Sequence, residues 1–306
     1  MELRQLEHFV AVAAEMNFSR AARRAHVVQS AMSASIAKLE RELDVQLFDR
    51  SRQQISLTAA GERFRGHALE VLQTARAAAE SVQEFRGALT GTVEFGSLIA
   101  FGPLDVAAAL GRFHHDHPHV RLRLHLSQSG ASAYLTALTE GSLDVALVSV
   151  PERFPPGLDM RLLFEEPMVY VCPKVGEPQQ RVDLADLADA ELVGLPGGFG
   201  LRRLMDDAFH AVGVQSRTRY EVPAGYAAIA ELVRNGLGTA FMPASEADRL
   251  TDLRAVPLVQ NVIWKVYLAS RPAARMTPAA VRLAETLQEA AATVRREQPR
   301  VPRRTP

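Results

Sequence analysis

The sequence predicts three consecutive parts: an all-α N-terminal unit, a long linker helix and a C-terminal α/β region. Apolar residues recur at helical spacing through residues 3–43, and a heptad pattern follows over residues 64–89. Short apolar runs then alternate with helical patterns as far as residue 294. The chain has 306 residues, of which 47% are hydrophobic and 23% charged, so it holds enough apolar side chains for two or three folded domains.

The composition excludes several classes of protein. Lys and Arg together number 35, as do Asp and Glu, so the chain is not a polycation that coats nucleic acid, although a local basic surface is compatible with this balance. Cys172 is the only cysteine, which rules out an internal disulfide and fits a reducing compartment. No basic-then-apolar leader and no run of about 18 apolar residues occurs, so we expect a soluble cytoplasmic protein.

Residues 1–58 are predicted to form a compact helical unit. A first helix has one apolar stripe made of Leu3, Leu6, Phe9, Val10 and Ala13. A short second helix is expected over 20–25 with Ser19 as its N-cap. A third is expected over 29–43, with a buried face comprising Ala31, Met32, Ile36, Leu39 and Leu43.

The exposed face of the third helix is polar, and a basic hairpin-like segment follows it. Two short helices in tandem with such a hairpin are typical of a winged helix-turn-helix. A helix fits the major groove of B-DNA, where Gln, Ser and Lys can bond base edges or phosphates. The periodicity alone is equally compatible with a small helical domain that has a solvated polar face. The candidate DNA-binding residues are Ser19, Arg20, Arg23, Gln29, Ser30, Ser33, Ser35, Lys38, Arg50 and Arg52.

The first 65 residues resemble the DNA-binding domain of LysR-type transcriptional regulators. The resemblance lies in Met1 to Leu6, Phe9, Phe18 to Ala22, Val27 to Ser33, Ile36, Leu39, Glu40, Leu43, Leu47 to Arg50 and Leu57 to Gly61. It implies that Gln29, Ser30 and Ser33 lie on the reading helix and that Arg50 and Arg52 lie on the wing. The chain departs from the family at Val28, Ala34, Ser35 and Gln53, where long polar, basic or Ser residues are usual. These departures affect the expected operator sequence more than the DNA-binding role.

A dimerising linker helix is predicted over 59–89. Its apolar residues follow the spacing 4, 3, 4, 3, 4, 3, 4, which is a heptad seam, and the helix would span about 45 Å. Such a stripe needs a partner, either a second copy or, as the alternative, the rest of its own chain. The seam comprises Phe64, Ala68, Val71, Ala75, Ala78, Val82, Phe85 and Leu89.

Residues 90–294 are predicted to form two α/β lobes. Strands are expected over 93–98, 120–126, 144–148, 168–172, 192–195, 219–222, 238–242 and 263–269. Helices are expected over 103–113, 134–140, 201–212, 226–235 and 277–294, the first with Pro103 in its opening turn. This region resembles the family's effector domain, which has the fold of periplasmic solute-binding proteins. The resemblance implies crossings between the lobes near 163–167 and 265–270, with lobe one at about 91–163 and 269–294 and lobe two at about 164–268.

A ligand cleft is expected beyond the carboxyl ends of the strands, where ligands bind in open α/β sheets. Several helix N-termini should converge there and favour an anionic group such as a carboxylate on a small effector. The candidate effector-binding residues are Ser97, Leu98, Ile99, Ala100, Phe101, Gln128, Ser129, Gly130, Gly198, Phe199, Gly200, Val222 and Pro223.

Other signals do not predict catalysis or a cofactor. His114, His115, His117 and His119 could bind zinc or nickel but are better explained as a surface turn, so no metal site is expected. The glycines at 194–200 do not form a dinucleotide fingerprint, and Cys172 is expected in the core. No catalytic constellation occurs, so the chain is not predicted to be an enzyme. Residues 295–306 hold five arginines and three prolines and are expected to be a disordered basic tail.

The resemblance therefore implies a transcriptional regulator. Its expected partners are double-stranded DNA bearing an inverted repeat, a small and anionic effector, and further copies of the chain in a homodimer or homotetramer. A solute-binding component or an enzyme with a DNA-binding appendage would be the competing classes. The sequence gives no signal for either.

Overall fold

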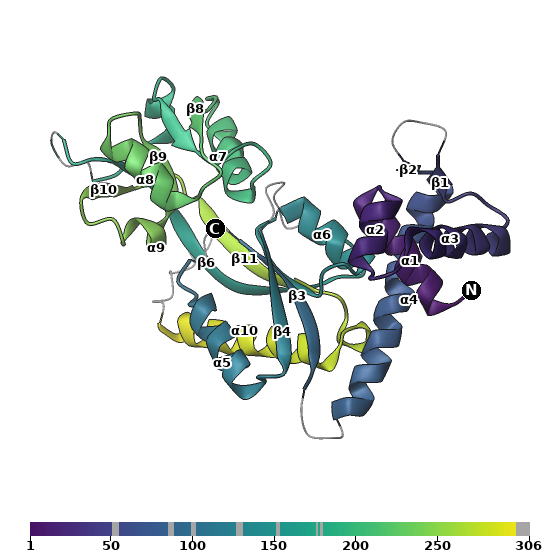
Figure 1. Cartoon of the computed structure of the whole chain (residues 1–306). Helices are drawn as coiled ribbons and strands as arrows, with labels where there is room; N and C mark the ends of the chain where they lie inside the picture. The colour runs from purple at the N-terminus through teal and green to yellow at the C-terminus, as the bar shows by residue number, and fades with distance from the viewer. Residues whose placement is uncertain are drawn as a thin grey trace.

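A computed structural model describes residues 1–50, 55–84, 89–98, 102–126, 131–150, 154–175, 177 and 180–297. A small helical unit at the N-terminus lies beside one end of the long helix α4, and the C-terminal α/β region forms the larger body (Figure 1). None of the helices in these ranges is both long enough and apolar enough to cross a membrane.

The N-terminal unit consists of α1 (Leu3–Glu15), α2 (Phe18–Arg24), α3 (Gln29–Leu43) and a two-stranded wing of β1 (Phe48–Asp49) and β2 (Ser56–Leu57). The predicted third helix is confirmed with the same bounds. Its buried side chains Met32, Ile36 and Leu39 pack with Phe9 and Phe48 in one core. Phe9 and Phe48 meet with ring centroids 5.3 Å apart.

Three details of this unit differ from the prediction. Asn17, not Ser19, caps α2, because its side chain accepts from the Arg20 amide at 3.0 Å. The helix therefore begins at Phe18, which the core buries. Leu3 and Ala31 were predicted to lie on the apolar faces of the first and third helices, but Leu3 is 48% exposed and Ala31 is also exposed.

The linker helix is α4 (Ala59–Glu84), and the predicted end at residue 89 is wrong since Leu89 is not helical. Phe64, Ala68 and Leu72 pack against the core of the N-terminal unit. The first part of the predicted seam is thus covered by the N-terminal unit of the same chain. This agrees with the alternative prediction that the helix packs against its own chain. Val71 and Val82 remain 41% and 67% exposed. Phe85 lies outside the described residues.

Ion pairs join α4 to the larger body. Arg65 of α4 contacts Glu140 at 2.7 Å, and Glu70 contacts Arg275 of the short helix η2 (Ala273–Arg275) at 3.2 Å. The N-terminal unit and the C-terminal region are therefore tied together through the side of this helix.

Lobe one contains β3 (Gly91–Ser97), β4 (Val120–Leu126) and β5 (Val145–Val148), with β3 parallel to both neighbours. Helices α5 (Val106–Asp116), α6 (Ala131–Glu140) and α10 (Pro278–Glu297) cover this sheet. Asp105 caps α5 by accepting from the Ala108 amide at 2.8 Å, so the helix starts three residues after Pro103 and the predicted start is wrong. Helix α10 continues to residue 297 and so includes the start of the predicted tail, whose residues from 298 onward lie outside the described ranges.

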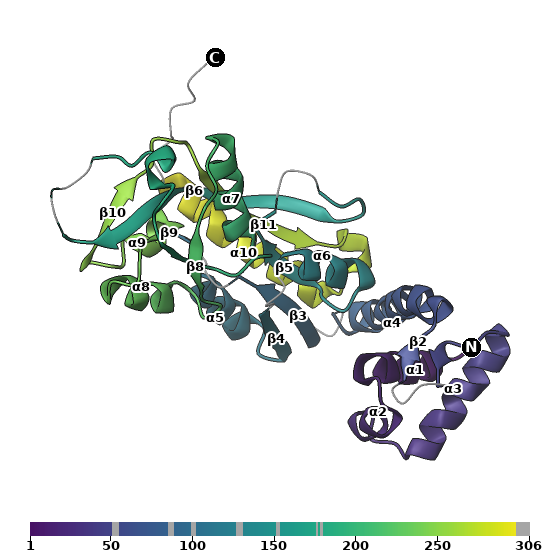
Figure 2. The same ribbon diagram turned by 90° about the horizontal axis from the view of Figure 1, so that it is seen from above.

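Two long antiparallel strands connect the lobes (Figure 2). Strand β6 (Asp159–Pro173) pairs with β11 (Ile263–Ser270) up to Pro167, and then with β9 (Ala240–Pro243) and β10 (Leu253–Pro257) of lobe two. The implied crossings are therefore found where expected. The predicted strand over 168–172 is only the second half of β6. For the first half the resemblance implied a crossing near 163–167, but the residue pattern predicted no strand there, because exposed polar residues such as Arg161 and Glu165 interrupt the apolar run.

Lobe two is completed by η1 (Leu184–Leu187), β7 (Leu192–Gly194), α7 (Gly200–Ala211), β8 (Thr218–Glu221), α8 (Tyr226–Arg234) and α9 (Ala244–Ala247). Strands β7 and β8 are parallel. The elements β10, η1 and α9 were not predicted. Cys172 is half-buried against the core, and burial raises the pKa of its thiol, which fits the expected core position.

Candidate nucleic-acid interface and interlobe cleft

The polar side of α3 is presented to solvent. Gln29, Ser30 and Lys38 are exposed, whereas Ser33 and Ser35 are half-buried, which corrects the prediction that all five lie on the exposed face. Val28 is the N-cap of this helix and is 68% exposed, and no side chain caps the helix there. Val28 has no side-chain acceptor, so the first backbone N–H groups of α3 receive no hydrogen bond from the N-cap side chain.

The candidate side chains around α3 form exposed polar contacts. Ser19 donates to the Gln29 side-chain oxygen at 2.9 Å, so residues of two helices are held together at the start of α3. Lys38 contacts Glu2 at 2.8 Å, which raises the pKa of the lysine. Exposed pairs of this kind contribute little to stability, so a phosphate can replace the carboxylate at little cost.

Glu15 forms ion pairs with two of the three arginines of α2. Arg24 contacts its carboxylate at 3.0 Å and Arg20 at 3.3 Å, and the hydrogen bonds from Arg24 and Arg20 lower the pKa of Glu15. Arg23 is exposed and has no ion pair within the described part of the chain. It is therefore the α2 candidate best placed to meet a phosphate.

Arg50 at the wing has a structural contact. Its guanidinium lies 3.0 Å from the Glu40 carboxylate and 4.9 Å from the centre of the Phe18 ring. Glu40 also accepts from the amides of Leu47 and Phe48, at 2.9 and 3.2 Å. This carboxylate fixes the turn from α3 into the wing. Arg52, the other wing candidate, lies outside the described residues.

Helix α4 packs closely against the segment that enters the wing, at Gly61. A Cβ on Gly61 would lie 2.1 Å from the Leu47 carbonyl oxygen, so a side chain at this position would force the helix away from the wing. Gly61 is one of the residues on which the resemblance rests, and its packing supplies a physical reason for that glycine.

A cleft lies between the two lobes. One region of about 690 Å³ is lined by Ser149, Val150, Gly200, Arg203, Leu204, Asp207, Ile263 and Lys265. A second region of about 1020 Å³ is lined by Glu165, Leu204, Asp207, Ala208, Asn261, Val262, Ile263 and Lys265. The shared side chains make the two regions continuous. Lobe one contributes the end of β5, lobe two contributes α7, and β6 and β11 form the floor.

Of the predicted effector-binding residues, Gly200 lines this cleft, at the first turn of α7. A Cβ on Gly200 would lie 2.4 Å from the Ser149 carbonyl oxygen, so the lobes approach each other closely here. Phe199 is buried in the core, Gly198 and Pro223 are exposed, and Val222 is half-buried. None of these four lines either cleft region.

The remaining effector candidates follow lobe-one strands. Ser97 is buried, and its hydroxyl donates to the Leu98 carbonyl at 3.3 Å. Tyr134 donates to the Ser97 carbonyl at 2.7 Å. Ile99, Ala100, Phe101, Gln128, Ser129 and Gly130 lie outside the described residues.

Sequence reasoning missed most of the cleft lining. Ser149 and Val150 follow the carboxyl end of β5, so the strand-end rule could have found them. Arg203 and Asp207 lie on α7 itself, one turn apart, and Lys265 lies within β11. No strand-end rule reaches those positions.

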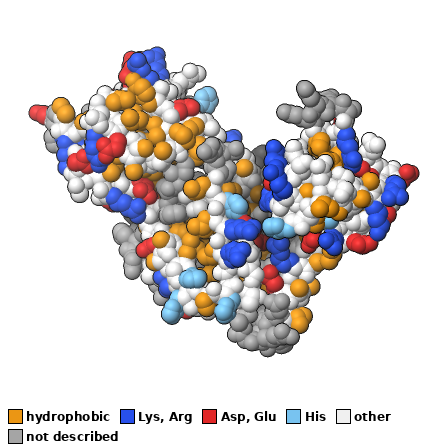
Figure 3. Space-filling view, viewed as in Figure 1, with side chains coloured by type: hydrophobic (Ala, Val, Ile, Leu, Met, Phe, Trp, Pro, Cys, Tyr) orange, Lys and Arg blue, Asp and Glu red, His pale blue; other side chains and the backbone are white. Residues whose placement is uncertain are grey.

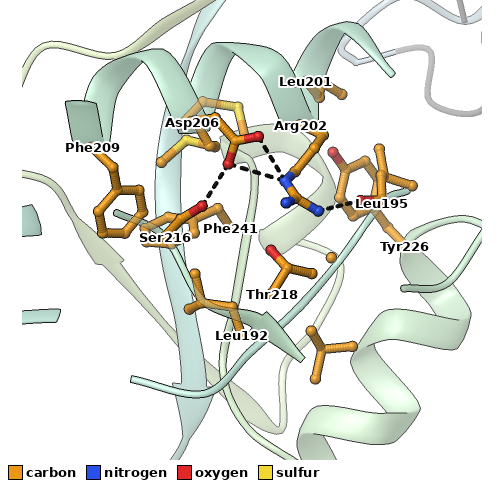
Figure 4. Close-up of a pocket in the computed structure, with 14 residues that line it drawn as sticks. Leu192, Leu195, Leu201, Arg202, Asp206, Phe209, Ser216, Thr218, Tyr226 and Phe241 are labelled. Atoms are coloured by element: carbon orange, nitrogen blue, oxygen red, sulfur yellow. Dashed lines mark hydrogen bonds and ion pairs between the residues drawn. The ribbon is translucent and has the colours of Figure 1, made fainter. Parts of the chain in front are cut away.

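The opposite side of α7 is closed by a polar network (Figure 4). Arg202 contacts Asp206 at 2.9 Å and Glu221 at 3.1 Å, and the Ser216 hydroxyl donates to Asp206 at 2.5 Å. These groups cover a small pocket with apolar walls from Leu192, Phe209 and Phe241. The network holds α7 against lobe two. Arg203 and Asp207, which follow Arg202 and Asp206 in the chain, line the cleft instead.

Histidine side chains gather on the surface around α5 (Figure 3). His114, His115 and His119 are exposed. Within the described ranges, no group of three or more His, Cys, Asp or Glu residues is arranged to hold a metal ion.

The fold and these two sites define a winged-helix DNA-binding regulator with a two-lobed ligand-binding domain. Comparison with known families agrees with this class. Residues 3–62 match the bacterial regulatory helix-turn-helix protein of the lysR family, and residues 86–292 match the LysR substrate binding domain. The chain therefore belongs to the LysR family of transcriptional regulators, and it is a DNA-binding regulator rather than an enzyme.

Relatives and solved structures are similar along most of the chain. The transcriptional regulator ShiR of Corynebacterium glutamicum is 35% identical over 79% of this chain and 82% of its own. IlvR of Caulobacter vibrioides is 30% identical over 87% and 92%. A full-length OxyR variant of Pseudomonas aeruginosa superposes with a TM-score of 0.76 at 25% identity, covering 99% of both chains. CbnR complexed with its target DNA gives a TM-score of 0.62 at 26% identity, covering 95% of this chain and all of that one.

Proposed function

We propose that this regulator binds an inverted-repeat operator as a homo-oligomer and responds to a small anionic effector held between its lobes. The observation that carries the DNA-binding half is the polar N-terminus of α3, where the side chains of Gln29 and Ser30 are exposed to solvent. The solved DNA complex of CbnR, a similar chain, supports the same use of this unit.

The reading residues are proposed to be Gln29, Ser30 and Ser33, with Ser35 and Lys38 further along α3. Ser19, Arg20 and Arg23 on α2, and Arg50 and Arg52 at the wing, are proposed to contact the phosphate backbone. Phosphate contacts position a protein on the duplex, while the contacts of α3 select the bases. Arg50 combines this role with its structural contact to Glu40.

The exposed part of α4 supports the homo-oligomer. Val71 and Val82 belong to the heptad seam and remain uncovered by the chain's own described residues, so a second α4 would bury them. A two-fold pair of units would match a two-fold operator. Substituting Val71→Glu and Val82→Glu together should shift the molecular mass in analytical ultracentrifugation toward the monomer. Arg63→Glu, off the seam on the same helix, is the control and should leave the mass unchanged.

The cleft supports an anionic effector. Arg203 and Lys265 line the region of about 690 Å³ together with the first turn of α7, whose free amides favour negative charge. Closure of the lobes on such a ligand would bias the arrangement of α4, because Arg275 and Glu140 of lobe one contact that helix. Effector binding would then change how the two N-terminal units of a dimer are arranged on the DNA.

A gel-shift assay with DNA from upstream of the chain's own coding sequence tests the proposal. Wild-type protein should retard this fragment at salt and competitor concentrations that abolish binding to scrambled DNA. Combined Gln29→Ala, Ser30→Ala and Ser33→Ala should remove that selectivity, whereas the exposed pair Gln180→Ala and Gln215→Ala should not. Retardation that is absent, or unchanged in the triple variant, would overturn the assignment of α3.

A further inference from the structure

We propose that the effector is a zwitterion of the α-amino-acid type, with its carboxylate toward Arg203 and its ammonium group toward Asp207 and Glu165. This inference rests on the proposed function, since it specifies the ligand of the same cleft. It differs from a simple anion in requiring positive charge on the ligand.

The two ends of the cleft differ in charge. The region of about 690 Å³ has the first turn of α7, Ser149, Arg203 and Lys265 in its lining. The adjoining region of about 1020 Å³ adds Glu165 and Asn261 and lacks Arg203, and Asp207 and Lys265 lie in the lining of both. A ligand that spans the junction therefore meets Arg203 and the first turn of α7 on one side, Glu165 on the other, and the opposite charges of Asp207 and Lys265 along both. A ligand with only negative charge would offer no partner to the Glu165 and Asp207 carboxylates, whereas an ammonium group would attract both.

Three of the cleft charges are not neutralised within the described part of the protein. Helix α7 carries two Arg–Asp pairs at the same i, i+4 spacing, a spacing that permits an ion pair. Arg202 and Asp206 do pair, at 2.9 Å, on the side away from the cleft. Within the described residues, the side chains of Arg203 and Asp207 form no ion pair within 4.0 Å and no hydrogen bond, and the same holds for the side chain of Glu165. Those three groups are therefore available to a ligand.

The spacing suits opposite charges that lie close together. Arg203 and Asp207 are one helical turn apart, which is about 6 Å along the axis. A carboxylate and an ammonium on one carbon atom can address both side chains, whereas widely separated charges cannot. Leu204, Ala208 and Ile263 supply apolar surface between and beside the charged groups, where the rest of the ligand can pack.

Thermal-shift and calorimetric titrations of the full-length chain test the inference. The probes are the twenty standard α-amino acids, the matching carboxylic acids without the amino group and, for the amino acid that binds most tightly, the matching amine without the carboxylate. We expect at least one amino acid to raise the melting temperature, by an amount that grows with the logarithm of its concentration once that concentration exceeds Kd. Both truncated analogues should bind at least tenfold more weakly.

Variants of the cleft locate the ligand. Asp207→Asn and Glu165→Gln should each weaken amino-acid binding about tenfold while leaving the deaminated acid bound as well as before or better. Arg203→Gln should weaken both ligands. Asp186→Asn, an exposed carboxylate of lobe two outside the cleft lining, is the matched control and should change neither affinity.

The contradicting results are distinct. Equal or tighter binding of the deaminated acid would overturn the zwitterion and leave the anionic effector standing. Amino-acid binding that is unaffected by Arg203→Gln and Asp207→Asn would place the ligand elsewhere and overturn the inference. No response to any amino acid would overturn it as well, and no response to the carboxylic acids either would also count against the proposed cleft ligand.

Discussion

Replacing Glu40 should unfold the turn between α3 and the wing. Its carboxylate, which is 13% exposed, accepts from the amides of Leu47 and Phe48 and pairs with Arg50. Leu47 and Phe48 are each 1% exposed, so Glu40→Ala leaves two amides without an acceptor. Each unsatisfied group costs about 1–3 kcal/mol, and the Arg50 pair adds less than about 1 kcal/mol. Because water can partly enter the site, we expect a loss of about 3 kcal/mol from the N-terminal unit.

Hydrogen exchange measured by mass spectrometry on peptides covering residues 29–50 gives the assay. Exchange in these peptides should accelerate by roughly a hundredfold, since about 1.4 kcal/mol corresponds to a factor of ten. Trp264, the only tryptophan, is buried in the C-terminal core, and its fluorescence transition should stay unchanged as an internal control. Glu40→Gln keeps an acceptor and should cost about 1 kcal/mol. A loss below about 1 kcal/mol for Glu40→Ala, or equal losses for both variants, would refute the reasoning.

Three further predictions concern single positions. Val28→Ser should stabilise α3 by about 1 kcal/mol, seen as slower exchange at its first turn, because the present N-cap offers no side-chain acceptor. Burial lowers the pKa of His8 below its ordinary value of 6.5, so the unfolded chain binds a proton first and stability should fall as the pH drops below about 6.5. His8→Gln should flatten that part of the pH profile of N-terminal unfolding. Asp144→Ala should cost about 3–5 kcal/mol in the Trp264 transition, because Arg271 lies 3.3 Å away and 7% exposed, and replacing both by apolar residues should recover most of that loss.

The N-terminal unit was largely predictable because its helices pack through a strong apolar period. The third helix begins and ends where its pattern does, since Met32, Ile36 and Leu39 occur at helical spacing and all face one core. The start of α2 was misplaced because Asn17 and Ser19 are both good caps, and the choice depends on burial of Phe18, a tertiary effect.

The cleft was less predictable because it is built by distant segments. Glu165 and Lys265 belong to strands that pair antiparallel across the lobes, a register that no local pattern specifies. Arg203 and Arg202 are adjacent and chemically identical, yet one lies in the cleft lining and the other is tied to Asp206. The strand-end rule identified the start of α7 at Gly200 but could not rank the loops by how close the lobes come.

Hydroxyl-radical footprinting of the chain on the DNA upstream of its own coding sequence tests the central claim most directly. Two copies of α3 presented by paired linker helices should protect two half-sites on one face of the duplex, about 10 base pairs or a multiple of that apart from centre to centre. The protected half-sites should be related by two-fold symmetry and should lose protection together in the triple variant of Gln29, Ser30 and Ser33. A single protected block, or protection that spreads evenly along the fragment, would contradict the account.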